Sequence, residues 1–181
     1  MTFEEKTLDS ERIYEGRILN LRYDEVTTVN GTSYREIIEH NGGAAIAALT
    51  NDRKLVMVKQ FRKPSDRVML EVPAGKRDGK EAGLDVARRE LKEETGYSAK
   101  SMTYLTSIFP AIGYSEEVLD IYLAEYLAVG ETDFDDNEAI DILEIPLEEL
   151  VDMIMAGKIE DAKSIVAIMM TAEVLRRRSD G

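Results

Sequence analysis

The sequence predicts an α+β fold, in which a small N-terminal β-layer precedes a mixed sheet that carries helices on its faces. Three strand-like runs follow one another between residues 11 and 39 without a helical pattern between them. Beyond them, strand-like and helical patterns are interspersed, and the chain ends in an amphipathic helical segment. The glycine pair at residues 42–43 divides these parts, so we expect a β-layer over residues 1–41 and a second domain over residues 42–181.

The N-terminal layer is expected to contain three strands, over residues 11–19, 21–30 and 33–39. Asn30-Gly31 is a strong hairpin signal, because both residues accept positive φ angles. Three short strands with one apolar face are not stable alone in water. The apolar surface of the layer therefore predicts a homodimer built through residues 11–40, and its members are Ile13, Ile18, Leu19, Val26, Val29, Ile37 and Ile38.

The second domain is expected to begin with a hairpin whose strands cover residues 44–50 and 54–61. A strand over residues 68–72 then leads through a Pro-Ala-Gly segment into a helix over residues 84–95. The remaining expected elements are strands over residues 103–109, 118–128 and 140–145, a helix over residues 146–156 that starts with a proline, and a last helix over residues 161–178.

Composition excludes several kinds of site. The chain has no cysteine, which rules out disulfides and thiolate metal sites, and its one histidine, His40, ends an expected strand, where a structural role is favoured. The net charge of −13 and the lack of a basic patch argue against nucleic-acid binding. No apolar run is long enough to predict a membrane span, and the acidic, polar N-terminus is unlike a signal peptide, so we expect a cytoplasmic protein.

The first expected helix carries a cluster of carboxylates. At about 100° per residue, Glu90 and Glu94 lie roughly 40° apart on one face, and Glu93 lies roughly 60° to the other side of Glu90. Like charges this close repel one another, and a hard cation such as Mg²⁺, which takes oxygen ligands, would relieve the repulsion. A solvated acidic helix is the alternative, and it is the preferred interpretation of these residues taken alone. Arg89 could orient a carboxylate, Gly96 is expected to end the helix, and the buried stripe consists of Leu84, Ala87 and Leu91.

Residues 75–97 read GKRDGKEAGLDVARRELKEETGY and match the pattern G-x5-E-x7-R-E-U-x-E-E-x-G-U, in which U is a bulky apolar or aromatic residue. This pattern is the signature of the Nudix hydrolases, which the chain resembles over roughly residues 12–175. The resemblance implies an α/β/α sandwich with a mixed sheet, and hydrolysis of a pyrophosphate linkage. The matching positions are Gly75, Glu81, Arg89, Glu90, Leu91, Glu93, Glu94, Gly96 and Tyr97.

The resemblance also implies a set of metal ligands. Glu90 and Glu94 are expected to be the primary ligands, and Glu93 a further ligand that could bridge two ions. The backbone carbonyl of Ala74 would complete the shell, and Gly75 would let the chain turn so that this carbonyl faces the metal. The expected ion is Mg²⁺, with Mn²⁺ as the alternative.

The remaining catalytic roles are less constrained by the pattern. Glu81 is either an outer-shell partner of metal-bound water or a partner of Arg89. In chains that resemble this one, an acidic residue on a loop after the signature often acts as the general base, and Glu138 occupies such a loop. Glu93 is the second candidate for the base and Asp136 the third. The alternative for the loop is a solvated acidic segment without a catalytic role.

A β-layer before the signature is typical of the branch that hydrolyses ADP-ribose and other nucleoside diphosphate sugars. In that branch the layer exchanges between the protomers of a homodimer, and both chains contribute to each substrate site. This chain departs from the branch where Ser-Pro-Gly is common, because it reads Ala111-Ile112-Gly113 and keeps only the glycine. The departure weakens ADP-ribose more than the class as a whole, so GDP-mannose or another sugar nucleotide is the alternative substrate. Further matching stretches are residues 55–62, 70–76, 113–125 and 157–168.

Four residues are candidates for contacts with the organic part of the substrate. Arg62 follows a buried strand and Arg35 lies in the N-terminal layer, and guanidinium groups bind phosphate and stack on adenine. Tyr114 and Glu117 could contact a ribose or another sugar. The alternative for both arginines is a surface position on an acidic protein. The non-enzymatic alternative for the whole chain is a catalytically silent module that senses ADP-ribose, which the presence of all three signature glutamates disfavours.

Overall fold

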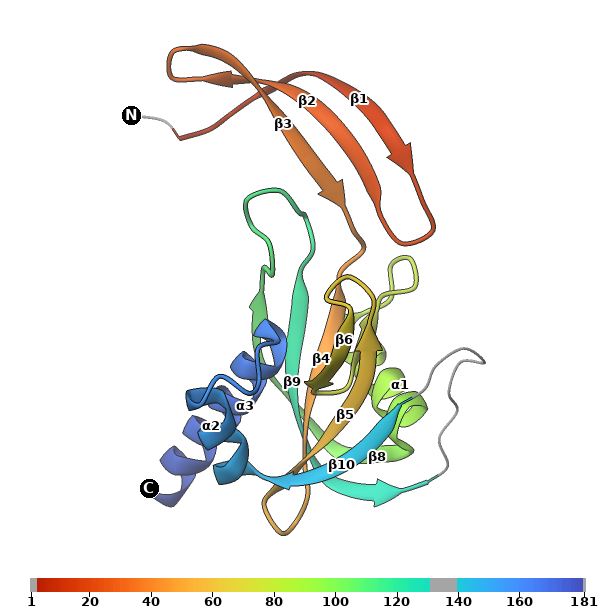
Figure 1. The fold of residues 1–181 in the computed structure, drawn as a ribbon, viewed down its shortest axis with the longest axis vertical. Coiled ribbons are helices and arrows are strands. Elements are labelled where there is room, and N and C mark those ends of the chain that lie inside the picture. Colours follow the sequence, from red (N-terminus) through yellow and green to blue (C-terminus); the bar gives the residue numbers. More distant parts are fainter. Residues whose placement is uncertain (1–2, 131–139, 181) are drawn as a thin grey trace. The chain divides into compact units, whose positions relative to one another are not determined.

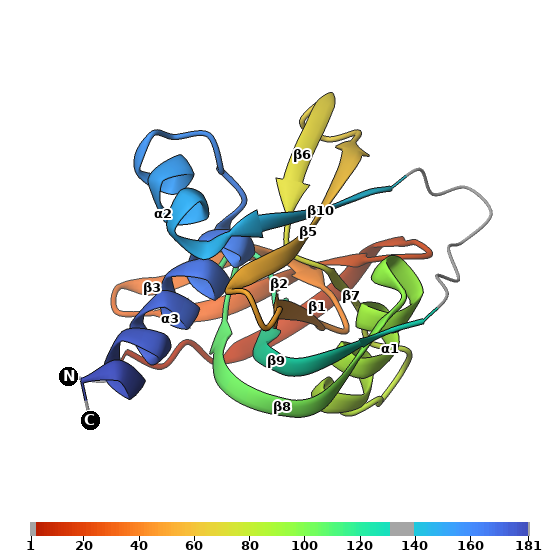
Figure 2. The ribbon, with the colours of Figure 1, turned by 90° about the horizontal axis from the view of Figure 1, so that it is seen from below.

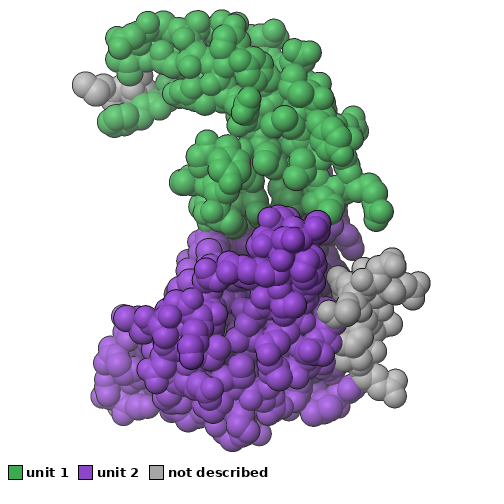
Figure 3. All heavy atoms as spheres, in the orientation of Figure 1, with its two compact units in different colours: residues 1–42, 109–118 green, residues 43–108, 119–181 purple. Residues whose placement is uncertain are grey.

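The computed structural model describes residues 3–130 and 140–180, which form two compact units (Figures 1 and 3). The N-terminal unit comprises residues 1–42 and 109–118, and the larger unit comprises residues 43–108 and 119–181. The sequence placed the boundary after residue 41 and assigned residues 109–118 to the second domain. The structure instead groups this segment with the N-terminal strands, and each unit is described below by itself.

The N-terminal unit is built on an antiparallel sheet of three strands, in the order β1-β2-β3, with β1 (Thr7–Glu15), β2 (Asn20–Thr28) and β3 (Gly31–Glu39). The first strand therefore starts and ends four residues earlier than expected. Its nine residues are all exposed, so they give no alternation of buried and exposed side chains from which the boundary could be predicted.

The hairpin between β2 and β3 turns one residue earlier than the Asn30-Gly31 signal suggests. Thr28 pairs with Gly31, so Val29 and Asn30 form the two-residue turn. Gly31 is the first strand residue and has a φ of +129°, a conformation that favours glycine. The predicted hairpin is present, and the glycine supports the residue after the turn.

Residues 109–118 are tied to β3 by backbone hydrogen bonds. The amide of Ile38 donates to the carbonyl of Tyr114 at 2.8 Å, and the amide of Glu116 donates to the carbonyl of Ile38 at 2.9 Å. Arg22 adds ion pairs to Glu39 at 3.1 Å and to Glu116 at 2.8 Å. These contacts link segments that are distant in sequence, which is why composition did not reveal the grouping.

The larger unit is built on a seven-stranded mixed sheet (Figure 2). Its strands are β4 (Gly43–Leu49), β5 (Lys54–Arg62), β6 (Arg67–Glu71), β7 (Ala74–Lys76), β8 (Tyr97–Ile108), β9 (Leu119–Val129) and β10 (Asp141–Pro146). The order is β10-β5-β4-β9-β8, with β6 paired to β5 and β7 paired to β4. Only the β4–β9 pair is parallel among the paired strands of the described residues.

Two of these strands differ from expectation. The short strand β7 has no periodic signal of its own, because three residues are too few to show one. The strand β8 begins at Tyr97, six residues before the expected start at residue 103. It lies at the edge of the sheet, and its first residues alternate only between intermediate and exposed positions, so they lack a strongly apolar face.

Helices cover both faces of the larger sheet (Figure 2), with α1 (Gly83–Thr95) on one face and α2 (Leu147–Met155) and α3 (Ala162–Ser179) on the other. Pro146 was expected as the first residue of α2, but it is the N-cap that precedes the helix. In the described ranges, no helix is both long and apolar enough to cross a bilayer.

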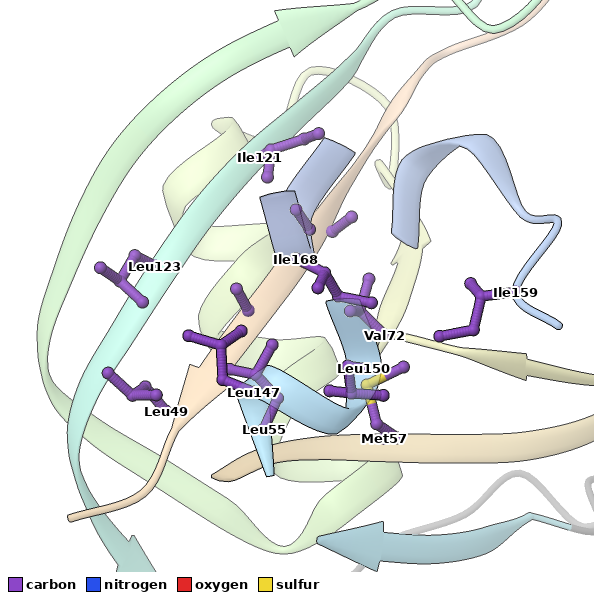
Figure 4. Close-up of a cluster of buried hydrophobic side chains, with 13 residues drawn as sticks. Leu49, Leu55, Met57, Val72, Ile121, Leu123, Leu147, Leu150, Ile159 and Ile168 are labelled. Carbon is purple, nitrogen blue, oxygen red and sulfur yellow. The ribbon is translucent and has the colours of Figure 1, made fainter. Parts of the chain in front are cut away.

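Alternation along β4 supplies both cores. Ala44, Ile46 and Ala48 are buried against α1, while Ala45, Ala47 and Leu49 are buried against α2 and α3. Figure 4 shows the second of these clusters, in which aliphatic side chains from the sheet meet those of the two helices. Its larger members are Leu55, Met57, Val72, Ile121, Leu123, Leu147, Leu150, Ile159 and Ile168.

A buried charge lies at the edge of this core. The Glu71 side chain, at the end of β6, is only 3% exposed and accepts hydrogen bonds from Nε and Nη2 of Arg62 at 2.7 and 2.8 Å. Lys163, in the first turn of α3, donates to Glu71 at 2.5 Å and to Asp161 at 2.9 Å. Burial alone would raise the pKa of Glu71, but the hydrogen bonds and charges of Arg62 and Lys163 outweigh burial and leave the pKa below its ordinary value.

Ser164 adds a neutral link beside this charge network. Asp161 is the N-cap of α3, and its Oδ2 accepts hydrogen bonds from the amide of Ser164 at 3.0 Å and from the Ser164 hydroxyl at 2.5 Å. The Ser164 hydroxyl in turn accepts a hydrogen bond from the amide of Val72 at 2.8 Å. The first turn of α3 is thereby attached to the two consecutive residues Glu71 and Val72.

We expect the Glu71→Gln variant to lose about 3 kcal/mol of unfolding free energy at pH 7, the lower end of the range for breaking a buried ion pair. The loss is at the lower end because Arg62 is 41% exposed and Lys163 keeps Asp161 as a partner. Because the pKa of Glu71 is lower in the folded state, its contribution is complete above its unfolded pKa of about 4.3 and disappears as the pH falls through the folded value. The stability difference between wild type and variant should therefore shrink below about pH 4.

Urea denaturation at a series of pH values measures this difference. Glu148→Gln is the matched control, because Glu148 forms an exposed ion pair with Arg53 and should change stability much less. If the difference in unfolding free energy between wild type and Glu71→Gln stays constant from pH 7 down to pH 3, the conclusion that Glu71 is ionised in the folded protein is wrong.

Candidate active site

The helix α1 holds three glutamates of the signature beside the strand β7. Buried Val86, Ala87 and Leu91 anchor one side of the helix against the sheet. Gly96 ends the helix with a φ of +72°, and its amide donates to the carbonyl of Lys92 at 2.8 Å. Because one face of the helix is fixed by its core contacts, the directions of Glu90, Glu93 and Glu94 are fixed as well.

The start of β7 contacts this helix through its backbone. Ala74 donates its amide hydrogen to Oε2 of Glu94 at 3.0 Å, and Glu94 is buried. The carbonyl of Pro73 accepts a hydrogen bond from the amide of Ile46 in β4 at 2.9 Å. The segment from residue 73 to residue 75 is therefore held between the central strand of the sheet and the signature helix.

Gly75 lies directly against Glu90. A Cβ atom at position 75 would be 1.9 Å from Cδ of Glu90, which no real side chain tolerates. Glycine at position 75 thus allows the Glu90 carboxylate to lie against the backbone, and any larger residue would require that carboxylate to shift. The Glu90 side chain is only 12% exposed, so it could move aside only by displacing its neighbours.

Arg89 connects three carboxylates of the signature. Its Nη1 donates to Glu90 at 2.6 Å and to Glu93 at 3.1 Å, and its Nε and Nη2 donate to Glu81 at 3.2 and 2.9 Å. A further bond runs from Nη2 to the carbonyl of Lys76 at 3.0 Å. The hydrogen bond from Arg89 is the main cause of a lowered pKa of Glu81, and the bonds to Glu81 lead the causes that raise the pKa of Arg89. Of the two roles considered for Glu81, the structure displays the pairing with Arg89.

The donor set suits a hard divalent cation. Glu90, Glu93 and Glu94 offer carboxylate oxygens, and Mg²⁺ and Mn²⁺ prefer such ligands. One guanidinium contacts Glu81, Glu90 and Glu93, so one positive charge faces three negative charges. Across residues 3–130 and 140–180, no three acidic or histidine side chains converge in a ready-made coordination shell. The residues therefore fit a cation chemically, and Glu90 and Glu93 now point their oxygens at Arg89.

Arg62 lies within electrostatic reach of this cluster. The hydrogen bonds to Glu71 are the first cause of its raised pKa, and the charge of Glu94 adds to the effect. Its guanidinium is used for the bidentate contact with Glu71 but remains 41% exposed. Arg62 is the predicted substrate-binding residue that belongs to the larger unit, which also contains the signature glutamates.

The other predicted substrate contacts belong to the N-terminal unit. Arg35 donates from Nε and Nη2 to Glu5 at 2.9 and 2.5 Å, and the ring of Tyr114 is exposed. Oε1 of Glu117 lies 3.7 Å from Nδ1 of His40, which accepts a hydrogen bond from the amide of Gly42 at 3.0 Å. The contact with Gly42 ties the His40 side chain to the local backbone.

Glu138 and Asp136, two candidates for the general base, lie outside the described residues. The remaining candidate, Glu93, is 40% exposed and bonded to Arg89. The structure further reveals three residues to which the sequence gave no role, namely Glu71, Lys163 and Ser164. They occur in the stretches 70–76 and 157–168, but nothing in a single sequence shows that these stretches meet.

Known proteins resemble this chain over nearly its whole length. It is 39% identical over 170 residues to an ADP-ribose pyrophosphatase of Bacillus subtilis (strain 168), with 92% of each chain covered. It is 40% identical over 169 residues to a methanol dehydrogenase activator of Bacillus methanolicus, with 92% of this chain and 91% of the relative covered. A crystal structure of an ADP compounds hydrolase superposes with a TM-score of 0.85 at 22% identity, covering 97% of this chain and 96% of that one. The last similarity confirms the predicted fold class.

The family follows from the signature, the site and these similarities together. The family model for the NUDIX domain matches residues 40–167, which is more than half of the chain. The matched region contains α1, the segment around Gly75 and all the glutamates that Arg89 contacts. The chain therefore belongs to the Nudix hydrolase family.

Proposed function

We propose that this Nudix pyrophosphatase uses Mg²⁺ or Mn²⁺ to hydrolyse nucleoside diphosphate sugars, and that ADP-ribose, cleaved to AMP and ribose 5-phosphate, is its main substrate. The observation that carries the proposal is the packing of Ala74 and Gly75 against Glu94 and Glu90. This contact brings the backbone of β7 against two signature glutamates of a helix that is held by core side chains. The name of the Bacillus subtilis relative supports ADP-ribose within that class.

Glu90, Glu94 and the carbonyl of Ala74 would hold the metal, and Glu93 would act as a further ligand. A divalent ion bound there would neutralise pyrophosphate charge and lower the pKa of a bound water. Arg89 keeps Glu90 and Glu93 close together before the metal arrives, because one guanidinium contacts both side chains. Gly75 leaves the room that Glu90 occupies.

The remaining roles concern the substrate and the base. Arg62 suits a phosphate group, since its guanidinium is partly exposed and close enough to Glu94 for their charges to interact. Arg35, Tyr114 and Glu117 would contact the nucleoside or the sugar from the N-terminal unit. Glu138 would take a proton from the attacking water, and Glu93 is the alternative base.

GDP-mannose or another sugar nucleotide is the second candidate substrate. The sequence Ala111-Ile112-Gly113 lacks the proline that is common in the ADP-ribose branch, and Ile112 is 82% exposed. This departure weakens ADP-ribose more than the class of sugar nucleotides as a whole, and the signature glutamates are all retained. A silent ADP-ribose sensor is the non-enzymatic alternative, and turnover distinguishes it from both enzymes.

The first prediction of the proposed function concerns the substrate and the metal. With Mg²⁺, ADP-ribose should be cleaved with a higher kcat/KM than GDP-mannose, UDP-glucose, NADH or dGTP, and product chromatography measures each rate. Removal of divalent ions by a chelator should abolish turnover, and added Mg²⁺ or Mn²⁺ should restore it. Full activity after exhaustive chelation would refute the metal dependence, and binding of ADP-ribose without turnover would favour the sensor.

The second prediction concerns the general base. Glu138→Gln should lower kcat by about a hundredfold or more and leave metal binding near the wild-type value, because a base acts on the attacking water. The acid limb of the pH profile of kcat should also disappear. Asp133→Asn, in the same acidic stretch, is the matched control and should keep both kcat and the acid limb. A Glu138→Gln variant with a normal rate and a normal acid limb would transfer the role to Glu93.

The third prediction concerns assembly. The three strands of the N-terminal unit carry large apolar side chains that are at least half exposed, and a layer of this kind needs a further surface to cover it. We propose a homodimer formed through residues 11–40, and sedimentation at micromolar concentration should show twice the mass of the chain. Ile13→Glu should shift the population toward monomer, whereas Val129→Glu, an exposed site in β9, should not. A stable wild-type monomer would contradict the proposal.

A further inference from the structure

The segment from Glu71 to Ala74 is held at four consecutive residues by different parts of the larger unit. Arg62 and Lys163 hold the side chain of Glu71, and Ser164 holds the amide of Val72. Two further bonds, from Ile46 to the carbonyl of Pro73 and from the amide of Ala74 to Glu94, complete the series. Only the last of these attachments, from Glu94, comes from the Nudix signature, and the first three come from elements outside it.

Ser164 is the centre of the attachment to α3. It is fully buried, and its hydroxyl both accepts from Val72 at 2.8 Å and donates to Asp161 at 2.5 Å. The Ser164 hydroxyl uses its hydrogen for the bond to Asp161, so its oxygen lone pairs remain available to accept the amide hydrogen of Val72. One orientation of the side chain therefore makes both contacts. The contact joins residues 92 positions apart in the sequence.

We propose that Ser164 is a positioning residue of the active site, which acts through Val72 to set the backbone of Ala74 and Gly75 against the signature glutamates. The inference rests on the proposed metal-dependent hydrolysis, because it assigns Ser164 a role in presenting the Ala74 carbonyl to the metal. Pro73 is the single residue between Val72 and Ala74 and has a restricted φ, so a shift at Val72 is transmitted to Ala74.

Loss of the Ser164 hydroxyl would leave the buried amide of Val72 without its acceptor. An unsatisfied buried amide is unfavourable, so the segment would move to find another partner. Movement of this segment changes the contacts of Ala74 with Glu94 and of Gly75 with Glu90, both of which are close. The effect should therefore appear in metal binding, and not only in stability.

The test compares Ser164→Ala with Thr171→Ala. Both residues are buried hydroxyl-bearing residues of α3, but Thr171 donates only to the carbonyl of Ala167 in its own helix at 2.8 Å. Electron paramagnetic resonance measures the binding of Mn²⁺ to each protein without substrate. Ser164→Ala should bind Mn²⁺ about tenfold more weakly than wild type, the size of effect typical of a residue that orients a ligand, and Thr171→Ala should stay within about twofold.

Kinetics give an independent measurement. For Ser164→Ala, the Mn²⁺ concentration that gives half-maximal hydrolysis of ADP-ribose should rise about tenfold, while KM for ADP-ribose at saturating Mn²⁺ should change by less than about twofold. Thermal unfolding of all three proteins separates this effect from a general loss of stability. Should Ser164→Ala fold poorly, Ser164→Cys keeps nearly the same volume with a much weaker acceptor and provides the same comparison.

The outcomes are distinguishable. The positioning role is supported if a Ser164 variant binds Mn²⁺ more weakly than wild type while Thr171→Ala does not. It is overturned if the Ser164 variants bind Mn²⁺ as tightly as wild type and Thr171→Ala do, and the proposed function then remains intact. A wild-type protein that neither binds Mn²⁺ nor hydrolyses any sugar nucleotide overturns the proposed function and the inference with it.

Discussion

The close approach of the Gly75 backbone to the Glu90 carboxylate is the contact on which the rest of the site depends. A single methyl group at position 75 would overlap the carboxylate, so backbone and side chain occupy the space together. Helix α1 cannot retreat to make room, because Val86, Ala87 and Leu91, which neighbour Glu90 and Glu94 on the helix, are packed in the core. The sheet cannot retreat either, since Ile46 in its central strand bonds the carbonyl of Pro73. Core packing of these two elements thus holds the backbone of residues 74–75 against the carboxylates of Glu94 and Glu90.

Carboxylates this close together repel one another, and nearby cationic side chains offset part of that repulsion. Arg89 contacts three carboxylates, and the geometry of one planar guanidinium with several donors allows this. Arg62 and Lys163 similarly compensate Glu71, which is buried at the start of the same segment. The two networks border the segment from residue 71 to residue 75 on either side. They differ in exposure, because Glu71 is almost fully buried while Glu93 is 40% exposed. The first network therefore suits a structural role, and the second suits exchange with a cation.

The parts of this arrangement that are local in sequence could be predicted, and those that join distant segments could not. Helical periodicity placed Glu90 and Glu94 on one face, and the spacing of Gly75 and Arg89 identified the family, which the NUDIX match confirms. The α+β fold is confirmed as well. The contact between Ser164 and Val72 joins two stretches whose separate patterns resemble an ordinary helix start and an ordinary strand end. The grouping of residues 109–118 with β3 escaped prediction for the same reason, since its backbone hydrogen bonds do not depend on side-chain type.

The charge balance also explains why an acidic protein can act on an anionic substrate. With a net charge of −13, long-range attraction would favour cations over a pyrophosphate. Two arginines beside the signature glutamates already have carboxylate partners, Arg89 with Glu81, Glu90 and Glu93, and Arg62 with Glu71. Neither guanidinium can neutralise a phosphate without sharing an existing carboxylate partner. Under the proposed function, a bound metal ion would supply further positive charge for the pyrophosphate. Metal binding would then precede or accompany productive substrate binding, because the net negative charge of the chain favours cations.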